Sequence, residues 1–218
     1  MDIDSKDTAL VITDPQNDFL SPEGVTWGLV GDSVTENRTV EHIEELARAA
    51  KAADMGVFVS PHYYYPADRG WLFGGTLENV MHEIDMFARR GALSLEGFEG
   101  SGADWLERYK PWLTDGETVI ASPHKVYGPA ANDLSLQLRK RRIDKVVLAG
   151  MSANLCVEAH MRGLIEDGFE VVVVKDATAG ARHPELGDVY EAALVNYGYI
   201  ASAVLTTEEV TASVAATV

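Results

Sequence analysis

Short runs of apolar, β-branched residues alternate along the chain with longer segments in which apolar positions recur at helical spacing. Most of the short runs are apolar nearly throughout, which is typical of strands buried on both faces of a parallel sheet. The predicted strands are Thr8–Thr13, Val57–Ser60, Thr118–Ala121, Lys145–Ala149, Phe169–Val174 and Tyr199–Leu205. The predicted helices are Ser33–Asp54, Asn132–Arg142, Ala153–Asp167 and Glu185–Tyr197. Strands separated by helices predict a three-layer α/β/α fold with a six-stranded, mostly parallel sheet.

One segment departs from this alternation. About 55 residues separate the second and third predicted strands, and a compact domain rarely keeps so long a connection without helices of its own. The segment is rich in Trp, Tyr, Phe and Gly, and residues 81–90 and 103–110 have helical patterns. We find no internal repeat and no linker composition, so residues 1–218 are predicted to form a single domain with an excursion over about 62–117.

Composition and charge exclude several classes of protein. The chain has 218 residues and a formal charge of 18 − 34 = −16, which argues against binding to nucleic acid or to anionic lipid. No apolar run approaches the roughly 18 residues of a membrane span, and the first residues lack a signal-peptide pattern. The single cysteine cannot form an intramolecular disulfide. We therefore expect a cytoplasmic protein that acts on a small molecule.

Ionisable and nucleophilic residues follow several of the predicted strands. Asp14 follows the first strand, His62 the second, His124 and Lys125 the third, and Cys156 lies just beyond the fourth. Ligands of parallel α/β sheets bind outside the carboxyl ends of the strands. The spacing therefore predicts that these side chains gather at one edge of the sheet.

The position of Cys156 favours a reactive thiol. It lies in the first turn of a predicted helix, where the dipole and unpaired N–H groups stabilise a thiolate. Asp14 would then accept the thiol proton, and Lys125 would balance the negative charge. Each residue alone has an ordinary structural alternative, because a buried cysteine often only packs, Asp before Pro opens turns, and Lys is usually solvated.

Three motifs together resemble the isochorismatase-like cysteine hydrolases. They are Asp14-x-Gln16-x-Asp18-Phe19, then Lys125, then the run from Gly150 to Val157 that contains Cys156. The resemblance covers essentially the whole chain and implies that family's α/β fold. It also implies a catalytic triad of Asp14, Lys125 and Cys156. In that family the thiolate attacks a carboxamide-type carbonyl, ammonia or an amine leaves, and water cleaves the thioester.

The resemblance also implies the groups around the nucleophile. Backbone N–H groups of Ser152 and Cys156 would hold the oxyanion, and a non-proline cis peptide would join Met151 to Ser152. The residues expected to bind substrate are Asp18, Phe19, His62, Tyr64, Tyr65 and Trp71. The aromatic members of this set have a second interpretation, which is packing at a subunit interface. The family's habit predicts a homodimer or homotetramer.

A metal site is not expected. Nicotinamidases of this family carry an Asp-x-His metal motif after the second strand, whereas this chain has Ser60-Pro61-His62. A neutral serine is a poor ligand for a divalent ion, although His82 in the excursion could in principle join His62. We therefore expect no metal and no other cofactor.

The preferred function is that of a metal-independent cysteine hydrolase cleaving a C–N bond of a small amide, ureido compound or related carboxamide. One alternative is a vinyl-ether or ester hydrolase on the same scaffold. Another is a catalytically silent member that serves binding or assembly. The residue set Asp14, Lys125 and Cys156 argues against the silent alternative.

Overall fold

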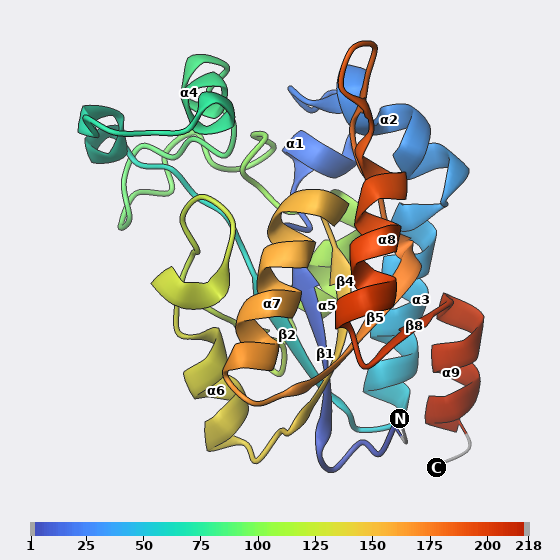
Figure 1. The fold of residues 1–218 in the computed structure, drawn as a ribbon. Coiled ribbons are helices and arrows are strands. Elements are labelled where there is room, and N and C mark those ends of the chain that lie inside the picture. The colour runs from blue at the N-terminus through green and yellow to red at the C-terminus, as the bar shows by residue number, and fades with distance from the viewer. Residues whose placement is uncertain (1–2, 216–218) are drawn as a thin grey trace.

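A six-stranded parallel sheet forms the centre of the protein, as Figure 1 shows for the computed structural model, which describes residues 3–215. The strand order is β3-β2-β1-β4-β5-β8, so the first strand lies inside the sheet. The strands are β1 (Thr8–Thr13), β2 (Gly56–Ser60), β3 (Val119–Ile120), β4 (Lys145–Gly150), β5 (Glu170–Thr178) and β8 (Ala203–Leu205). This confirms the predicted six-stranded sheet. Helices pack on both faces of the sheet, which gives the predicted three-layer fold.

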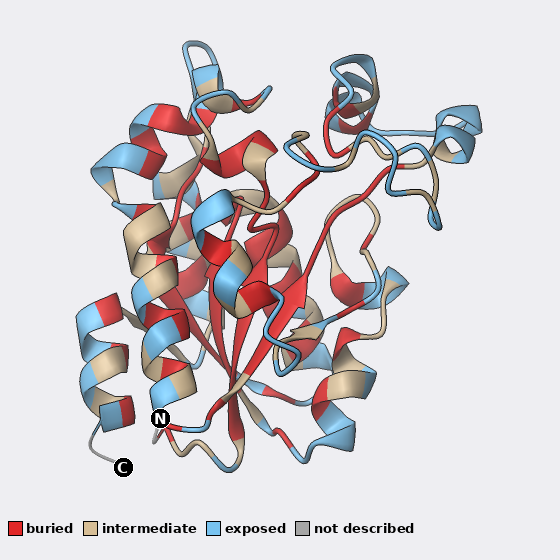
Figure 2. Cartoon of the chain, turned by 180° about the vertical axis from the view of Figure 1, so that it is seen from behind, coloured by how far each residue is buried: buried red, intermediate tan, exposed pale blue. Residues whose placement is uncertain are grey.

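Alternation along the strands divides the core into two layers. Leu10 and Ile12 of β1 pack with the helices of one face, and Ala9 and Val11 pack with those of the other. The first face is covered by α2 (Trp27–Glu36), α3 (Thr39–Ala52) and α9 (Thr207–Ala215). The second is covered by α6 (Leu134–Lys140), α7 (Glu158–Glu166) and α8 (Val189–Ile200). Figure 2 shows the buried residues running through the strands and along the inner sides of these helices.

Shorter elements connect this framework. They are the helices α1 (Asn17–Leu20) and α5 (Lys110–Leu113), the hairpin strands β6 (Arg182–His183) and β7 (Gly187–Asp188), the 3₁₀ turns η1 (Pro66–Gly70), η2 (Glu107–Tyr109) and η3 (Pro129–Ala131), and the π-helical turn η4 (Ala153–Val157). The hairpin β6–β7 occupies the start of the predicted helix Glu185–Tyr197. Asp188 then caps α8 by accepting hydrogen bonds from the N–H groups of Tyr190 and Glu191.

The predicted helix Ser33–Asp54 is interrupted. Arg38 adopts a left-handed conformation with φ 50°, which separates α2 from α3. The side chains on either side of it, Asn37 and Thr39, both donate to the carbonyl of Thr178 at the end of β5, at 3.0 and 3.3 Å. The apolar pattern continues across this break, so the tertiary hydrogen bonds determine where the helix is interrupted.

The excursion lies beside the carboxyl ends of the strands and carries α4 (Thr76–Glu83) at its outer part (Figure 1). The predicted helix over 81–90 ends at Glu83, because the following segment pairs with residues near β2. Phe87 N donates to Asp18 Oδ2 at 2.6 Å, and Phe87 O accepts from Tyr64 N at 3.0 Å. In residues 103–110 only the 3₁₀ turn η2 and the start of α5 are helical. The excursion is thus held to the sheet by buried hydrogen bonds rather than by a long helix.

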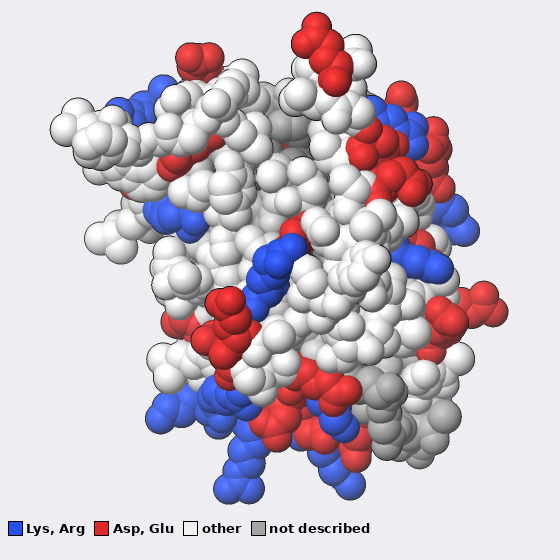
Figure 3. Space-filling model, viewed as in Figure 1, with Lys and Arg blue, Asp and Glu red and all other residues white. Residues whose placement is uncertain are grey.

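Charged side chains are unevenly distributed over the surface. In Figure 3 many Lys, Arg, Asp and Glu side chains lie at the end opposite the excursion, whereas the face between α4 and the β6–β7 hairpin is largely uncharged. No helix within residues 3–215 is long and apolar enough to span a membrane.

The end of β4 requires glycine. Gly150 has φ +114°, and a Cβ atom there would lie 2.1 Å from the carbonyl oxygen of Thr13 on β1. Met151 N then donates to the same carbonyl at 3.0 Å, so the two strands stay in close contact just before the loop that carries the cysteine. The close approach fixes where this loop leaves the sheet.

We predict that Gly150→Ala lowers the free energy of unfolding by at least about 2 kcal/mol, because it combines left-handed strain with a backbone clash. Gly28→Ala in α2 is the matched control, since a Cβ there meets nothing within 4 Å. The control should be neutral or stabilising by about 0.5–1 kcal/mol. Denaturant unfolding measures both, and equal stabilities of the two variants would contradict the prediction.

Candidate functional site

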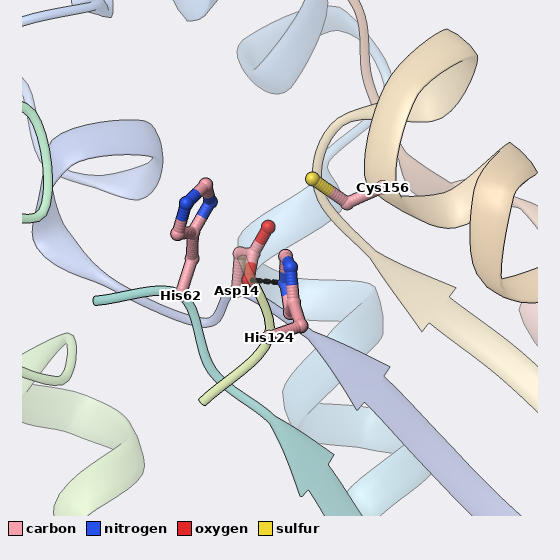
Figure 4. A group of neighbouring side chains, drawn as sticks. All are labelled: Asp14, His62, His124 and Cys156. Carbon is pink, nitrogen blue, oxygen red and sulfur yellow. Dashed lines mark hydrogen bonds and ion pairs between the residues drawn. The ribbon is translucent and has the colours of Figure 1, made fainter. Parts of the chain in front are cut away.

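Asp14 leaves the end of β1 in a left-handed conformation, with φ 47°. Such a conformation is uncommon for a residue other than glycine and often marks a functional position. The carboxylate is fully buried, and its Oδ1 accepts a hydrogen bond from His124 Nε2 at 2.8 Å. Its Oδ2 has no hydrogen-bond partner among the described residues, and Figure 4 shows it pointing toward Cys156. Asp14 is therefore placed to exchange a proton with the thiol.

His124 reaches Asp14 because the chain leaving β3 contains an extra residue relative to the chain leaving β2. Val59 pairs with Ile120, and further along His62 pairs with His124 in an isolated bridge. The chain of β2 advances three residues over this interval (59 to 62), whereas that of β3 advances four (120 to 124). This bulge brings the His124 ring to the side of His62, with ring centroids 4.7 Å apart. The imidazole of His124 thus occupies the position beside Asp14.

Lys125 has other partners in the structure. Its ammonium donates to the carbonyl of Tyr63 at 2.7 Å, forms an ion pair with Asp68, and lies 4.2 Å from the centre of the Tyr65 ring. Within residues 3–215 no hydrogen bond or ion pair joins Lys125 to Asp14 or to Cys156. Side chains of adjacent residues in extended backbone point in opposite directions, and here His124 is the one hydrogen-bonded to Asp14. The role of Lys125 in a triad stays a prediction.

Cys156 lies in the π-helical turn η4, which continues into α7. Its thiol is 1% exposed. Burial raises the pKa of Cys156 well above its ordinary value, and the Asp14 carboxylate adds to this effect. The backbone N–H groups of Ser152 and Cys156 act on the pKa in the opposite direction. Desolvation thus opposes the thiolate that the helix start favours.

The backbone around the predicted oxyanion donors has the expected form. The peptide bond between Met151 and Ser152 is cis, which confirms that part of the prediction. Ser152 O accepts from Val157 N at 3.2 Å, which closes the π turn. Ser152 thus lies at the start of the π turn and Cys156 within it, and their role as oxyanion donors stays a prediction.

His62 is the fourth side chain of a buried group that also contains Asp14, His124 and Cys156. It is fully buried, and neither ring nitrogen has a hydrogen-bond partner in the described part of the chain. Burial lowers the pKa of His62 well below its ordinary value, and the neighbouring His124 and Lys125 lower it further. Figure 4 shows His62 and Cys156 on either side of the Asp14 carboxylate. A neutral imidazole here offers one donor and one acceptor to a bound molecule.

Ser60, which replaces the metal-binding carboxylate of the nicotinamidases, belongs to a second network. Its hydroxyl lies 2.7 Å from His160 Nε2 and accepts from Asn132 Nδ2 at 2.8 Å. His160 Nδ1 in turn lies 2.6 Å from the carbonyl of Cys156. Burial lowers the pKa of His160 well below its ordinary value. This network supports the cysteine loop from behind, so Ser60 is not free to ligate an ion beside His62.

His82 does not lie in direct ring contact with His62 among the described residues. The ring of Tyr64 packs against both imidazoles, with centroids at 4.5 Å from His62 and 4.3 Å from His82. The arrangement therefore does not fit an ion shared by His62 and His82.

The other substrate-binding candidates lie at different depths. Asp18 is buried and accepts from the N–H groups of Phe87 and Val25, and burial raises its pKa. Phe19 packs in the core against Phe87 with ring centroids 5.2 Å apart, so its expected place in a substrate site is corrected to a core position. Asp18 acts chiefly as an anchor of the excursion.

Two clefts border the site from the side of the excursion. The larger, of about 470 Å³, is lined by Tyr64 and Tyr65, and also by Asp18, His82 and Arg89. A second cleft of about 390 Å³ is lined by Trp71 and His82. Tyr64 lies at the boundary, because it both lines the larger cleft and packs against His62. The predicted aromatic residues thus include cleft-lining side chains.

The sequence predicted His124 only as one of the residues at the edge of the sheet, and it gave no role in the site to His160 or Asn132. The signal for His124 was its place three residues after a predicted strand. Two adjacent polar residues, His124 and Lys125, follow that strand, and only the bulge determines which of them faces Asp14. No comparable signal marked His160, which lies four residues after Cys156 on the same helix face.

The comparisons with known proteins agree on one family. A family model for the Isochorismatase domain matches residues 8–209. The ureidoacrylate amidohydrolase of Stutzerimonas stutzeri is 29% identical over 211 residues, covering 91% of this chain and 80% of that protein. A solved cysteine hydrolase from Pseudomonas syringae pv. phaseolicola has a TM-score of 0.81 at 23% identity, covering 100% of this chain and 97% of its own. The N-carbamoylsarcosine amidase of Thermoplasma acidophilum has a TM-score of 0.65 at 19% identity, covering 92% and 96% of the two chains.

The buried histidines predict how stability depends on pH. His62 and His160 have folded-state pKa values below the ordinary 6.5, so they stay neutral when folded but are protonated when unfolded in mild acid. These two groups therefore do not reduce the free energy of unfolding above about pH 7. The free energy of unfolding decreases as the pH falls below 6.5 toward their folded-state pKa values. Each histidine contributes at most about 1.4 kcal/mol per pH unit to this dependence.

Denaturant unfolding between pH 7.5 and 5 measures the effect. His62→Gln should make the slope shallower, whereas His183→Gln, at an exposed position, should leave it unchanged. An identical slope in wild type and in the His62 variant would contradict the prediction.

Proposed function

Because the chain belongs to the isochorismatase family of hydrolases, we propose that it is a cysteine hydrolase that cleaves the C–N bond of a small amide, ureido compound or related carboxamide without a metal. The observation that carries this proposal is the buried group of Asp14, His62, His124 and Cys156, whose ligand atoms lie within 4.8 Å of one another. The similarity to a ureidoacrylate amidohydrolase and to an N-carbamoylsarcosine amidase supports a C–N substrate.

The first chemical step is formation of an acyl-enzyme. Asp14 Oδ2, which has no other partner among residues 3–215, accepts the thiol proton of Cys156 as the sulfur attacks the substrate carbonyl. The raised pKa of Cys156 means that this transfer accompanies attack rather than precedes it. The N–H groups of Ser152 and Cys156 stabilise the negative charge that develops on the carbonyl oxygen.

The proton then returns to the leaving group. Asp14 donates it to the substrate nitrogen, the C–N bond breaks, and ammonia or an amine departs from the thioester. Water attacks the thioester carbonyl, Asp14 accepts a proton from it, and the thiol is restored as the acid product leaves. His124 keeps the Asp14 carboxylate oriented throughout by donating from Nε2 to Oδ1.

His62 is placed to orient the substrate. Its neutral ring offers a donor and an acceptor at the edge of the group, which suits an amide or ureido moiety because such moieties carry both kinds of partner. The four side chains are at most 1% exposed, so the substrate must enter by displacing part of the surrounding aromatic wall. Tyr64, between His62 and the larger cleft, is the side chain that separates the two.

The proposal is tested with a panel of small amides, ureides and carbamates, in which released ammonia is measured. We expect turnover of at least one class by wild type and none by Cys156→Ala. The thiol contributes to chemistry rather than to packing, so the variant should lose no more than about 1 kcal/mol of stability. Intact-protein mass spectrometry during slow turnover should detect an acyl group on Cys156. Substantial turnover by the alanine variant would rule out this nucleophile.

The roles of His124 and Lys125 are separable by paired substitutions. His124→Ala should reduce kcat/KM by at least about 10²-fold, since the base loses its orienting donor, and His124→Gln, which keeps a donor, should lose less. Lys125→Ala should reduce kcat/KM by less than about tenfold. The reverse order, with the larger loss in the Lys125 variant, would restore the triad expected from the family.

Asp14→Asn should affect turnover and alkylation in opposite directions. Turnover should fall by at least about 10²-fold because the proton acceptor is lost. Alkylation of Cys156 by iodoacetamide at a fixed pH should become faster, because removing the carboxylate lowers the pKa of the thiol. Mass spectrometry follows alkylation, and a slower reaction in the variant would show that Asp14 does not raise the pKa of Cys156.

A further inference from the structure

The catalytic group is also a set of metal-binding atoms. Asp14, His62, His124 and Cys156 each offer one atom, all within 4.8 Å of one another, and all four side chains are buried. Such a combination of one thiol, two imidazoles and one carboxylate is typical of sites for zinc and related transition metals. Magnesium and calcium prefer sites built only of oxygen atoms, so the donor set selects against them.

Several of these atoms have unused hydrogen-bonding capacity. Asp14 Oδ2, His124 Nδ1 and both ring nitrogens of His62 are buried and have no partner among residues 3–215. Buried polar atoms without partners are uncommon because desolvation is then uncompensated. The unpartnered atoms of Asp14 and His62 therefore indicate a ligand that accepts lone pairs as well as a substrate that makes hydrogen bonds.

An ion would replace the hydrogen bond between His124 and Asp14. His124 Nε2 and Asp14 Oδ1 lie 2.8 Å apart and point toward one another, so both residues can bind one ion on this side of the imidazole ring. The ring proton of His124 then lies on Nδ1, which has no partner among residues 3–215. His160 is excluded from the set, because both of its nitrogens already bond to Ser60 and to the carbonyl of Cys156.

The distances permit a four-coordinate ion after small adjustments. Zinc bonds of about 2.0–2.3 Å in a tetrahedron place neighbouring ligand atoms roughly 3.3–3.8 Å apart. The observed spread of up to 4.8 Å requires side-chain movements of about 1 Å, of the size that rotamer adjustment supplies. His62 is able to make such a movement, since no hydrogen bond from the described residues holds its ring.

We propose that Zn²⁺ binds to Cys156, His62, His124 and Asp14 and thereby switches the hydrolase off. The sulfur forms a bond to the ion as its proton passes to the buffer, so its lone pair no longer attacks a carbonyl, and Asp14 Oδ2 no longer accepts a proton. The site differs from the nicotinamidase arrangement, because its ligands include the nucleophile and its base. The inhibitory effect rests on the proposed function, whereas the binding does not.

Binding is tested with Co²⁺ and Zn²⁺ on the full-length, metal-free protein. Co²⁺ should produce a thiolate-to-cobalt charge-transfer band in the near ultraviolet and the intense visible bands of four-coordinate cobalt, and Zn²⁺ should displace it. Cys156→Ser should remove the charge-transfer band. His62→Ala should weaken Co²⁺ binding by at least about tenfold. His82→Ala is the matched control, since His82 belongs to the neighbouring aromatic contacts but not to the ligand set, and it should bind Co²⁺ as wild type does.

Inhibition is tested in parallel. One equivalent of Zn²⁺ should suppress both amide turnover and alkylation of Cys156, and EDTA should reverse both effects. A missing charge-transfer band together with unprotected Cys156 would overturn the site, and loss of binding in the His82 variant but not in the His62 variant would overturn the ligand set. Activity that EDTA abolishes and Zn²⁺ restores would overturn the inhibitory role. A protein that binds Co²⁺ as described but hydrolyses no member of the amide panel would support the site and refute the proposed function.

Discussion

The hydrogen bond from His124 Nε2 to Asp14 Oδ1 connects residues that follow the first and third strands, across the intervening second strand. Both side chains are fully buried, so the bond is shielded from water and neither group has a competing solvent partner. It fixes the plane of the carboxylate and leaves the second oxygen facing the cysteine. The carboxylate keeps this orientation toward Cys156 only while the bond holds.

The same burial opposes formation of the thiolate of Cys156, which is the reactive form of the thiol. A thiol at a helix start would ordinarily become a better nucleophile, but desolvation and the adjacent carboxylate raise the pKa of Cys156. The histidines around it are kept neutral for the same reason, because burial lowers the pKa of His62 and of His160. The surroundings of Cys156 therefore disfavour charge on its thiol and on both of these imidazoles.

The sheet and the gathering of Asp14 and Cys156 at its edge were predictable because they depend on local patterns. Strands buried on both faces have continuous apolar runs. Asp14 directly follows one such run, and Cys156 lies in the turn after another. The break at Arg38 and the end of α4 at Glu83 were not predictable, because distant partners, Thr178 and Asp18, determine them. Phe19 was assigned to a substrate site although its ring fills the core against Phe87, and a motif alone does not distinguish these roles. Whether His124 or Lys125 faces Asp14 depends on one extra residue in the chain that leaves β3. Neither composition nor periodicity reveals that residue.

That extra residue makes the group beside Asp14 exchangeable without a substitution. Between Ile120 and His124 the chain has one residue more than between Val59 and His62, and removing it would turn the next side chain inward. An ammonium would then stand where an imidazole now stands, and an insertion would reverse the exchange. Within such a lineage, a single codon gained or lost in this loop changes the chemical type of the group beside Asp14. Alignments that place gaps freely in the loop would conceal the event.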